Sequence, residues 1–297
     1  MGQATSPSAG IRYGRARVCR VWGMARSTVY WQRQAPGAAG RRPGPLGPCT
    51  DEELVGQIRG VLQASPFQGE GYRKVWARLR YAGVHTSPRR VLRLMRERGL
   101  LAPQRQGQPH GSKAHDGSIT PNRINTLWGT DMTATFTRED GQVAIFIAVD
   151  HGSAECVGIH AAKQGTRFEA LEPIRQGVRT YVGAFGEDVA RGLSVRHDHG
   201  SQYMSRVFQD ELKFLGLTSS PAFVREPQGN GCAARFIRTL KENLLWLTTV
   251  DTVEELRVAL LEFQQRYNEA WLIGRHGDKT PTQVRQEQLA ALTQQVA

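Results

Sequence analysis

The spacing of apolar residues changes along the chain and divides it into two halves. Between residues 10 and 98, apolar side chains recur at three- and four-residue intervals, the period of amphipathic helices. From residue 124 onward, alternating and continuous apolar runs take over, which is typical of strands. The pattern predicts an all-α N-terminal part followed by an α/β part.

The first helical pattern spans residues 10–33, where Gly23 separates two short amphipathic stretches. Its apolar residues can share one helical face: Ile11, Val18, Val21 and Trp22. This spacing predicts a helix-turn-helix, with a plain helical hairpin as the alternative.

The second helical pattern, residues 51–103, predicts three helices. Thr50 can cap the first, ahead of three acidic residues, and Pro88 begins the third because proline is favoured at the first helical position. Arginines populate the outer face of the third helix: Arg89, Arg90, Arg93 and Arg96. Since arginine offers donors to phosphates and base edges, this helix is predicted to bind DNA; the alternative is a merely solvated basic face.

Two polar stretches set the expected domain boundaries. Residues 35–50 are rich in proline and glycine and residues 104–121 are polar, so both are expected to be linkers. They separate three parts and a tail: an N-terminal helix-turn-helix-like segment (1–34), a helical DNA-binding domain (51–103), an α/β core (122–290) and a polar tail (291–297).

The net charge of +12 is concentrated at the front of the chain. Residues 1–120 hold 20 basic and 6 acidic side chains, whereas residues 121–297 hold 19 basic and 21 acidic ones. A basic front half indicates a polyanion-binding module. No apolar run reaches the roughly 18–20 residues of a membrane span. The four cysteines lack C-x-x-C spacing, so we expect free thiols in a cytoplasmic protein.

The second half predicts a mixed α/β sheet. Three strands come first, followed by alternating helices and strands. The expected strands cover residues 128–136, 143–149, 155–161, 193–197 and 218–223; the expected helices cover 166–182, 205–215, 231 onward and 251–267.

Two aspartates stand out in this half. Asp131 lies within a strand, where a carboxylate is costly unless it is paired or metal-bound, and Asp198 ends a strand. Alone, each has an ordinary explanation, as a salt-bridged strand residue and as a turn or cap. Together they suit Mg²⁺, which takes oxygen ligands. Two such ions, about 3.5–4 Å apart, can activate the attacking oxygen and stabilise the leaving oxygen of a phosphodiester.

Other candidate ligands fit less well. Asp150 is expected to be a turn residue. His197 and His199 alternate around Asp198 and invite a zinc interpretation, but no further His or Cys follows at ligand spacing.

Four motifs resemble those of DDE transposases and retroviral-type integrases, in particular the OrfB-type transposases of bacterial insertion sequences. They are W-G-T-D around Asp131, H-D-H-G-S-Q-Y around Asp198, G-N-G-C-A-A-R-F-I-R-T-L-K-E around position 234, and Y-N-E-A-W through K-T-P near 267–281. The resemblance covers about residues 10–285 and implies a ribonuclease H-like fold. It assigns metal binding to Asp131 and Asp198, with Mg²⁺ or Mn²⁺ and two ions in an active relative.

The resemblance also implies a polynucleotidyl transferase. Its reaction would be metal-dependent cleavage of element ends, followed by attack of a freed 3′-hydroxyl on target DNA, hence DNA integration, recombination and transposition. Arg238, Lys241 and the helix at 88–98 would contact DNA. The implied partners are DNA, further copies of the chain on DNA and a small upstream helix-turn-helix protein, in the bacterial nucleoid.

Position 234 departs from the family. After Asp198, 35 residues intervene before position 234, where the family has a glutamate and this chain has Ala234. Ala234, Arg238 and Lys241 share a helical face, so a glutamate here would head a basic stripe. Glu242 points about 80° away in an ideal helix, and Glu226 has the wrong spacing, so neither is expected to substitute.

The missing carboxylate predicts impaired catalysis, because losing a metal ligand raises the barrier by several kcal/mol. Engineering and natural decay both explain Ala234. The main alternative is a non-catalytic DNA-binding protein that binds element ends or inhibits active multimers. A nuclease of the same fold without strand transfer is a third.

Overall fold

The computed structural model describes residues 4–32, 49–103, 121–222 and 230–296, in two compact units, residues 1–47 and 48–297. The expected linkers at 35–50 and 104–121 fall almost entirely outside the described residues, as does Glu226. None of the described helices is both long and apolar enough to cross a membrane.

The first unit contains two short helices, α1 (Arg15–Val21) and α2 (Arg26–Gln32). Gly23 turns the chain between them with a φ of +62°, a conformation that glycine adopts without strain. The expected shared apolar face is wrong: Ile11 precedes α1, and Val21 and Trp22 are exposed, at 75% and 59%. Two seven-residue helices are too short to cover such a face, and Cys19 is the buried residue of α1.

The second unit begins with the three predicted helices, α3 (Asp51–Ala64), α4 (Tyr72–Tyr81) and α5 (Pro88–Glu97). Thr50 and Glu53 form a reciprocal capping box at the start of α3, and the Ser87 side chain caps α5. The inward faces of the three helices make one apolar core, which includes Leu54, Ile58, Val75, Leu79, Val91 and Leu94.

The α/β part forms a five-stranded sheet in the order β3-β2-β1-β4-β5. The strands are β1 (Leu127–Thr137), β2 (Gly141–Asp150), β3 (Cys156–Ala162), β4 (Ser194–His197) and β5 (Thr218–Pro221). The first three are antiparallel, whereas β4 pairs parallel to β1 and β5 parallel to β4. This confirms the predicted mixed α/β, ribonuclease H-like sheet preceded by helical segments.

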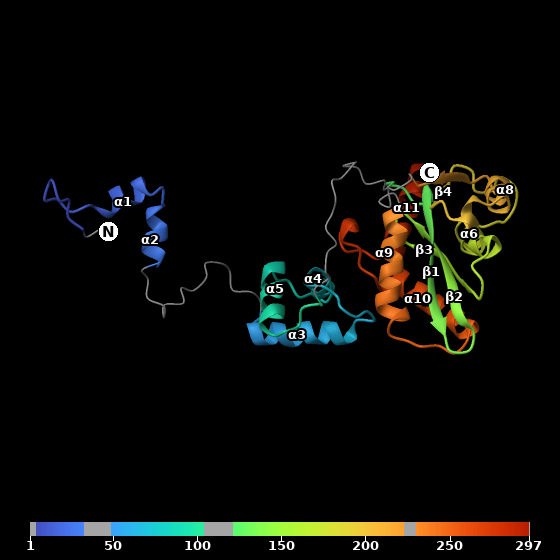
Figure 1. Cartoon of the computed structure of the whole chain (residues 1–297), viewed down its shortest axis with the longest axis horizontal. Coiled ribbons are helices and arrows are strands. Elements are labelled where there is room, and N and C mark those ends of the chain that lie inside the picture. The colour runs from blue at the N-terminus through green and yellow to red at the C-terminus, as the bar shows by residue number, and fades with distance from the viewer. Residues whose placement is uncertain (1–3, 33–48, 104–120, 223–229, 297) are drawn as a thin grey trace. The chain divides into compact units, whose positions relative to one another are not determined.

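Helices cover both faces of the sheet (Figure 1). On one face, alternate residues of β2 pack against α9 (Gly231–Leu240) and α10 (Val253–Ala270). On the other, Trp128 and Phe146 pack against α6 (Arg167–Tyr181) and α8 (Arg206–Phe214). The continuous apolar run of β2 follows from this arrangement, because both of its faces are buried.

Shorter elements complete the core: α7 (Ser201–Met204), a π-helical turn η2 (Lys241–Leu245) and a 3₁₀ turn η3 (Gly274–His276). The last helix, α11 (Pro281–Val296), corrects the expected tail at 291–297, which is helical as far as residue 296. Thr280 and Gln283 each accept a hydrogen bond from the other's backbone, which caps α11 before a run of good helix formers.

Candidate functional site

Parallel pairing of β1 and β4 brings the two predicted aspartates together. Gly129 pairs with Arg196, and continuing that register by two residues places Asp131 level with Asp198. Adjacent strands lie about 4.8 Å apart, so the carboxylates converge at the point where the chain leaves β4. Asp131 also faces α9, because its antiparallel partner Ile147 belongs to the core on that side of the sheet.

The two carboxylates have different environments. Asp131 is half-buried and accepts a hydrogen bond of 2.8 Å from the Met132 amide, while Asp198 is exposed and accepts one of 2.8 Å from the Gly200 amide. Burial raises the pKa of Asp131, and the charge of Asp198 raises it further; the Met132 amide and Lys241 oppose the rise. In both, Oδ2 receives no hydrogen bond from the part of the chain that the structure describes, so it is available to a ligand.

Helix α9 confirms the predicted faces around position 234. Phe236, Ile237 and Leu240 are buried, whereas Ala234 and Arg238 are exposed. The prediction for Glu242 assumed an ideal α-helix, but the backbone becomes π-helical at Lys241. The Glu242 carboxylate accepts a 2.9 Å hydrogen bond from Arg238.

The donor set fits one hard cation better than two. Within residues 121–222 and 230–296, as elsewhere in the described chain, no three His, Cys, Asp or Glu side chains cluster closely enough to hold a metal. Burial, and then the charge of Asp198, raise the pKa of Asp131, so a divalent cation would relieve this pair of converging carboxylates. Ala234 contributes no oxygen to a second ion.

The other candidate ligands have structural partners. Asp150 accepts hydrogen bonds from the Ser153 amide (3.0 Å) and hydroxyl (2.7 Å), so it is the turn residue that the sequence predicted. His197 is buried; its Nδ1 donates to the Asp198 carbonyl (2.6 Å), and Nε2 therefore accepts from the Ser219 hydroxyl (2.9 Å). Both ring nitrogens are used, which argues against the zinc alternative.

The arginines of α5 divide into two groups. Arg90 and Arg93 both bind Asp51 at the start of α3, at 2.7 and 2.6 Å. They therefore hold α5 against α3, and burial and pairing reduce what they can offer to a nucleic acid. Arg89 and Arg96 are exposed, without an ion pair to any described residue.

Sequence reasoning missed several buried polar groups beside Asp131. Asn230 precedes α9 and donates a 2.9 Å hydrogen bond to the Thr130 carbonyl. A Cβ at Gly129 would collide with the side chains of Asn230 and His151, so the site depends on glycine there. The glycine within a strand was the available signal, because such a residue often marks a close approach.

Comparisons with known proteins give a consistent assignment. A family described as "HTH-like domain" matches residues 50–108. The chain is 26% identical over 286 residues to the "Insertion element IS2A uncharacterized 48.2 kDa protein" of Escherichia coli, covering 87% of this chain and 65% of that protein. It is 26% identical over 227 residues to the E. coli "Transposase InsD for insertion element IS2A/D/F/H/I/K", covering 74% of this chain and 73% of that one.

Among solved structures, the catalytic core domain of BIV integrase is similar with a TM-score of 0.43 and 22% identity, covering 57% of this chain and 99% of that chain. The chain spans somewhat less than two thirds of the length of the 48.2 kDa relative. Three findings agree with one another: the similarity to the IS2 proteins, the match to the HTH-like domain family and the observed mixed sheet. These similarities agree with the resemblance of the chain to DDE transposases and retroviral-type integrases.

Proposed function

We propose that this chain is a transposase-type DNA-binding protein whose core holds a divalent cation, Mg²⁺ or Mn²⁺, between Asp131 and Asp198 and is impaired in strand cleavage and transfer. The observation that carries the proposal is the parallel register of β1 and β4, which brings Asp131 on β1 level with Asp198 directly after β4, beside a helix with Ala234 in place of an acid. The names of the IS2 relatives support transposition as the ancestral activity.

The residues of the core have distinct roles in this proposal. Asp131 and Asp198 would hold the cation. When bound, such a cation neutralises charge on the phosphodiester oxygens and lowers the pKa of the attacking oxygen. Arg238, exposed on α9, and Lys241, half-buried at the start of η2, form a basic stripe that contacts backbone phosphates. With Ala234, the second cation position lacks a ligand, and the barrier to strand cleavage rises by several kcal/mol.

The helical domain supplies DNA contacts of its own. Arg89 and Arg96 project from α5 into solvent, whereas Arg90 and Arg93 keep α5 in place through Asp51. We therefore assign direct contact to Arg89 and a supporting role to Arg90 and Arg93. Target and element-end DNA, assembly with further copies and an upstream helix-turn-helix protein are the proposed partners.

A second candidate is a non-catalytic protein that occupies element ends or joins and inhibits active multimers. The observation that favours it is a basic α9 stripe and an intact sheet combined with the loss of one ligand. Both candidates require DNA binding, and they differ in whether restoring the acid restores chemistry.

DNA binding is tested by fluorescence anisotropy on a labelled duplex over a salt series. Lys241→Ala is expected to weaken binding and to reduce the slope of log affinity against log salt by about 1. Lys213→Ala is the matched control, since Lys213 is exposed on α8, outside the stripe. An unchanged slope for Lys241→Ala, or an equal loss for both variants, would contradict the assigned surface.

A further inference from the structure

Thr130, the residue before Asp131, is a point where three elements of the site meet. It is fully buried on β1. Its carbonyl accepts the 2.9 Å hydrogen bond from Asn230, which begins the helix that carries position 234. On the other face of the strand, its hydroxyl faces the phenol of Tyr203, which belongs to the segment that follows Asp198.

Tyr203 is packed on all sides. Its ring stacks on His197 with centroids 5.7 Å apart and meets the edge of Phe208 at 5.3 Å. Because His197 holds the Asp198 carbonyl, the Tyr203 ring is linked through one neighbour to the position of Asp198.

The hydroxyls of Tyr203 and Thr130 are both buried, and neither makes a hydrogen bond of ordinary geometry to any described residue. A buried hydroxyl without a partner costs about 1–3 kcal/mol, so two of them facing each other require an explanation. A small shift that closes a hydroxyl–hydroxyl bond satisfies both groups at once. The closed bond would fix α7 against β1.

We propose that Thr130 connects the segments that carry the proposed cation site to β1. Tyr203 and Asn230 are positioning residues that act through Thr130. Tyr203 sets the Asp198 segment against β1 by bonding the Thr130 hydroxyl. Asn230 sets α9 against β1 by bonding the Thr130 carbonyl. The inference rests on the proposed function, because it assigns these residues to the alignment of a cation site.

The two residues have different consequences for metal binding. Tyr203 aligns the two carboxylates that are present, so its loss weakens cation binding in any background. Asn230 aligns position 234, which contributes no ligand in this chain. Its effect on cation binding therefore emerges only when an acid is restored there.

The test is a Mn²⁺ titration of the full chain, followed by electron paramagnetic resonance of the free ion. Tyr203→Phe and Asn230→Ala are made in the chain as it stands and in Ala234→Glu. Tyr203→Phe is expected to lower Mn²⁺ affinity roughly tenfold in both backgrounds. Asn230→Ala is expected to leave it unchanged with alanine at 234 and to lower it roughly tenfold with glutamate there. Tyr30→Phe, at an exposed tyrosine, is the matched control.

Equal losses for both variants in both backgrounds would indicate general loosening and would overturn the assignment, as would no loss for either variant. If the chain binds no Mn²⁺ in either background, the result contradicts the proposed cation site rather than the positioning roles. A double-mutant cycle of Thr130→Val and Tyr203→Phe, by urea unfolding in EDTA, then still decides the hydroxyl bridge. A coupling of about threefold or more in the unfolding constant is expected, and strictly additive variants would overturn the bridge.

Discussion

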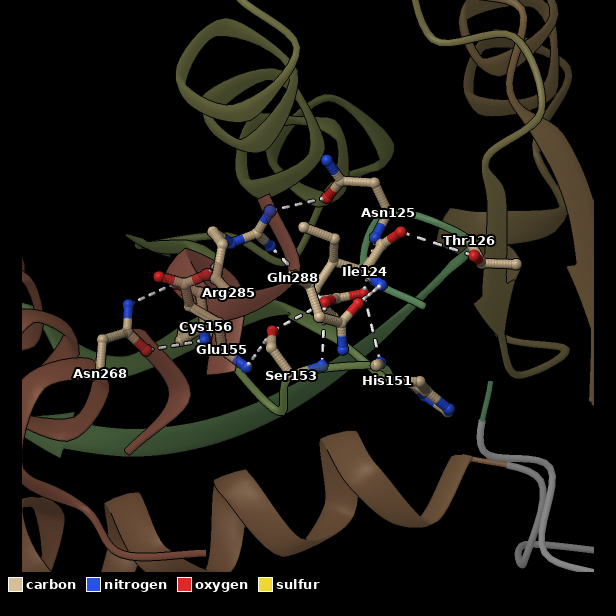
Figure 2. A network of polar contacts seen from close by, with 12 residues as sticks. Ile124, Asn125, Thr126, His151, Ser153, Glu155, Cys156, Asn268, Arg285 and Gln288 are labelled. Atoms are coloured by element: carbon tan, nitrogen blue, oxygen red, sulfur yellow. Dashed lines mark hydrogen bonds and ion pairs between the residues drawn. The ribbon is translucent and has the colours of Figure 1, made fainter. Parts of the chain in front are cut away.

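Removing the buried guanidinium of Arg285 is predicted to be strongly destabilising. Arg285 extends from α11 between Asn125 and Glu155 (Figure 2), donating to Asn125 Oδ1 at 3.1 Å and binding the Glu155 carboxylate. The Asp150 carboxylate lies 3.6 Å from the same guanidinium. Arg285→Met keeps an apolar stem but leaves two acids buried without their cation. Breaking a buried ion pair on one side costs about 3–5 kcal/mol, and we expect a loss of that size at neutral pH.

The loss should depend on pH in a defined direction. Burial already raises the pKa of Glu155, and Arg285 lowers it, so the substitution raises it further. A carboxyl group with a raised pKa holds its proton more tightly in the folded than in the unfolded state, so stability falls as the pH rises from the ordinary pKa of 4.5 toward the folded one. The destabilisation by Arg285→Met should therefore be smaller near pH 4.5 than at pH 7.

Urea unfolding at both pH values, followed by tryptophan fluorescence, measures the effect. Arg206→Met is the matched control, because the Arg206–Asp210 pair lies on the surface of α8 and exposed pairs contribute little. A loss below about 1 kcal/mol for Arg285→Met, or the same loss at both pH values, would refute the argument from buried charge.

Local patterns determined most of the fold. The alternation of β1 and the continuous apolar run of β2 predicted both strands, because period-2 spacing assigns each side chain to a face. Thr50 as a cap and Pro88 as a first helical residue predicted two helix starts to the residue, because both signals are local.

The site was predictable only in part. Asp131 and Asp198 could be named from the sequence, but their level placement depends on the register of β1 and β4. The pairing of Asp51 with Arg90 and Arg93 joins residues about forty positions apart, which no local pattern contains. Nor does a local pattern contain the contacts of Thr130, whose partners come from two distant elements. The π-helical turn at Lys241 departs from the ideal-helix geometry that was assumed for the residues after it.

Three further outcomes are expected. Asp131→Asn should raise the melting temperature in EDTA at neutral pH, because burial and the charge of Asp198 disfavour a negative charge on Asp131, and it should abolish Mn²⁺ binding. An unchanged melting temperature would show that the charge of Asp131 does not destabilise the fold. Thr50→Ala should destabilise the protein by about 1 kcal/mol in urea unfolding, since it removes the hydroxyl that accepts a hydrogen bond from the Glu53 amide; a neutral result would argue against that cap. Gly129→Ala should lower stability by about 1–3 kcal/mol in the same assay, because its Cβ meets buried side chains; full stability would show that Asn230 and His151 can move aside.

We propose that the chain retains the architecture of a strand-transfer enzyme and lacks one metal ligand at position 234. The most direct measurement is a Mg²⁺- and Mn²⁺-dependent cleavage-and-joining assay on labelled DNA carrying the ends of the element that encodes the chain. The chain as it stands and the Ala234→Glu variant are compared side by side. We predict that both bind the DNA and that only Ala234→Glu cuts and joins it. Cleavage and joining by the unaltered chain would contradict the account, because another group would then complete the site.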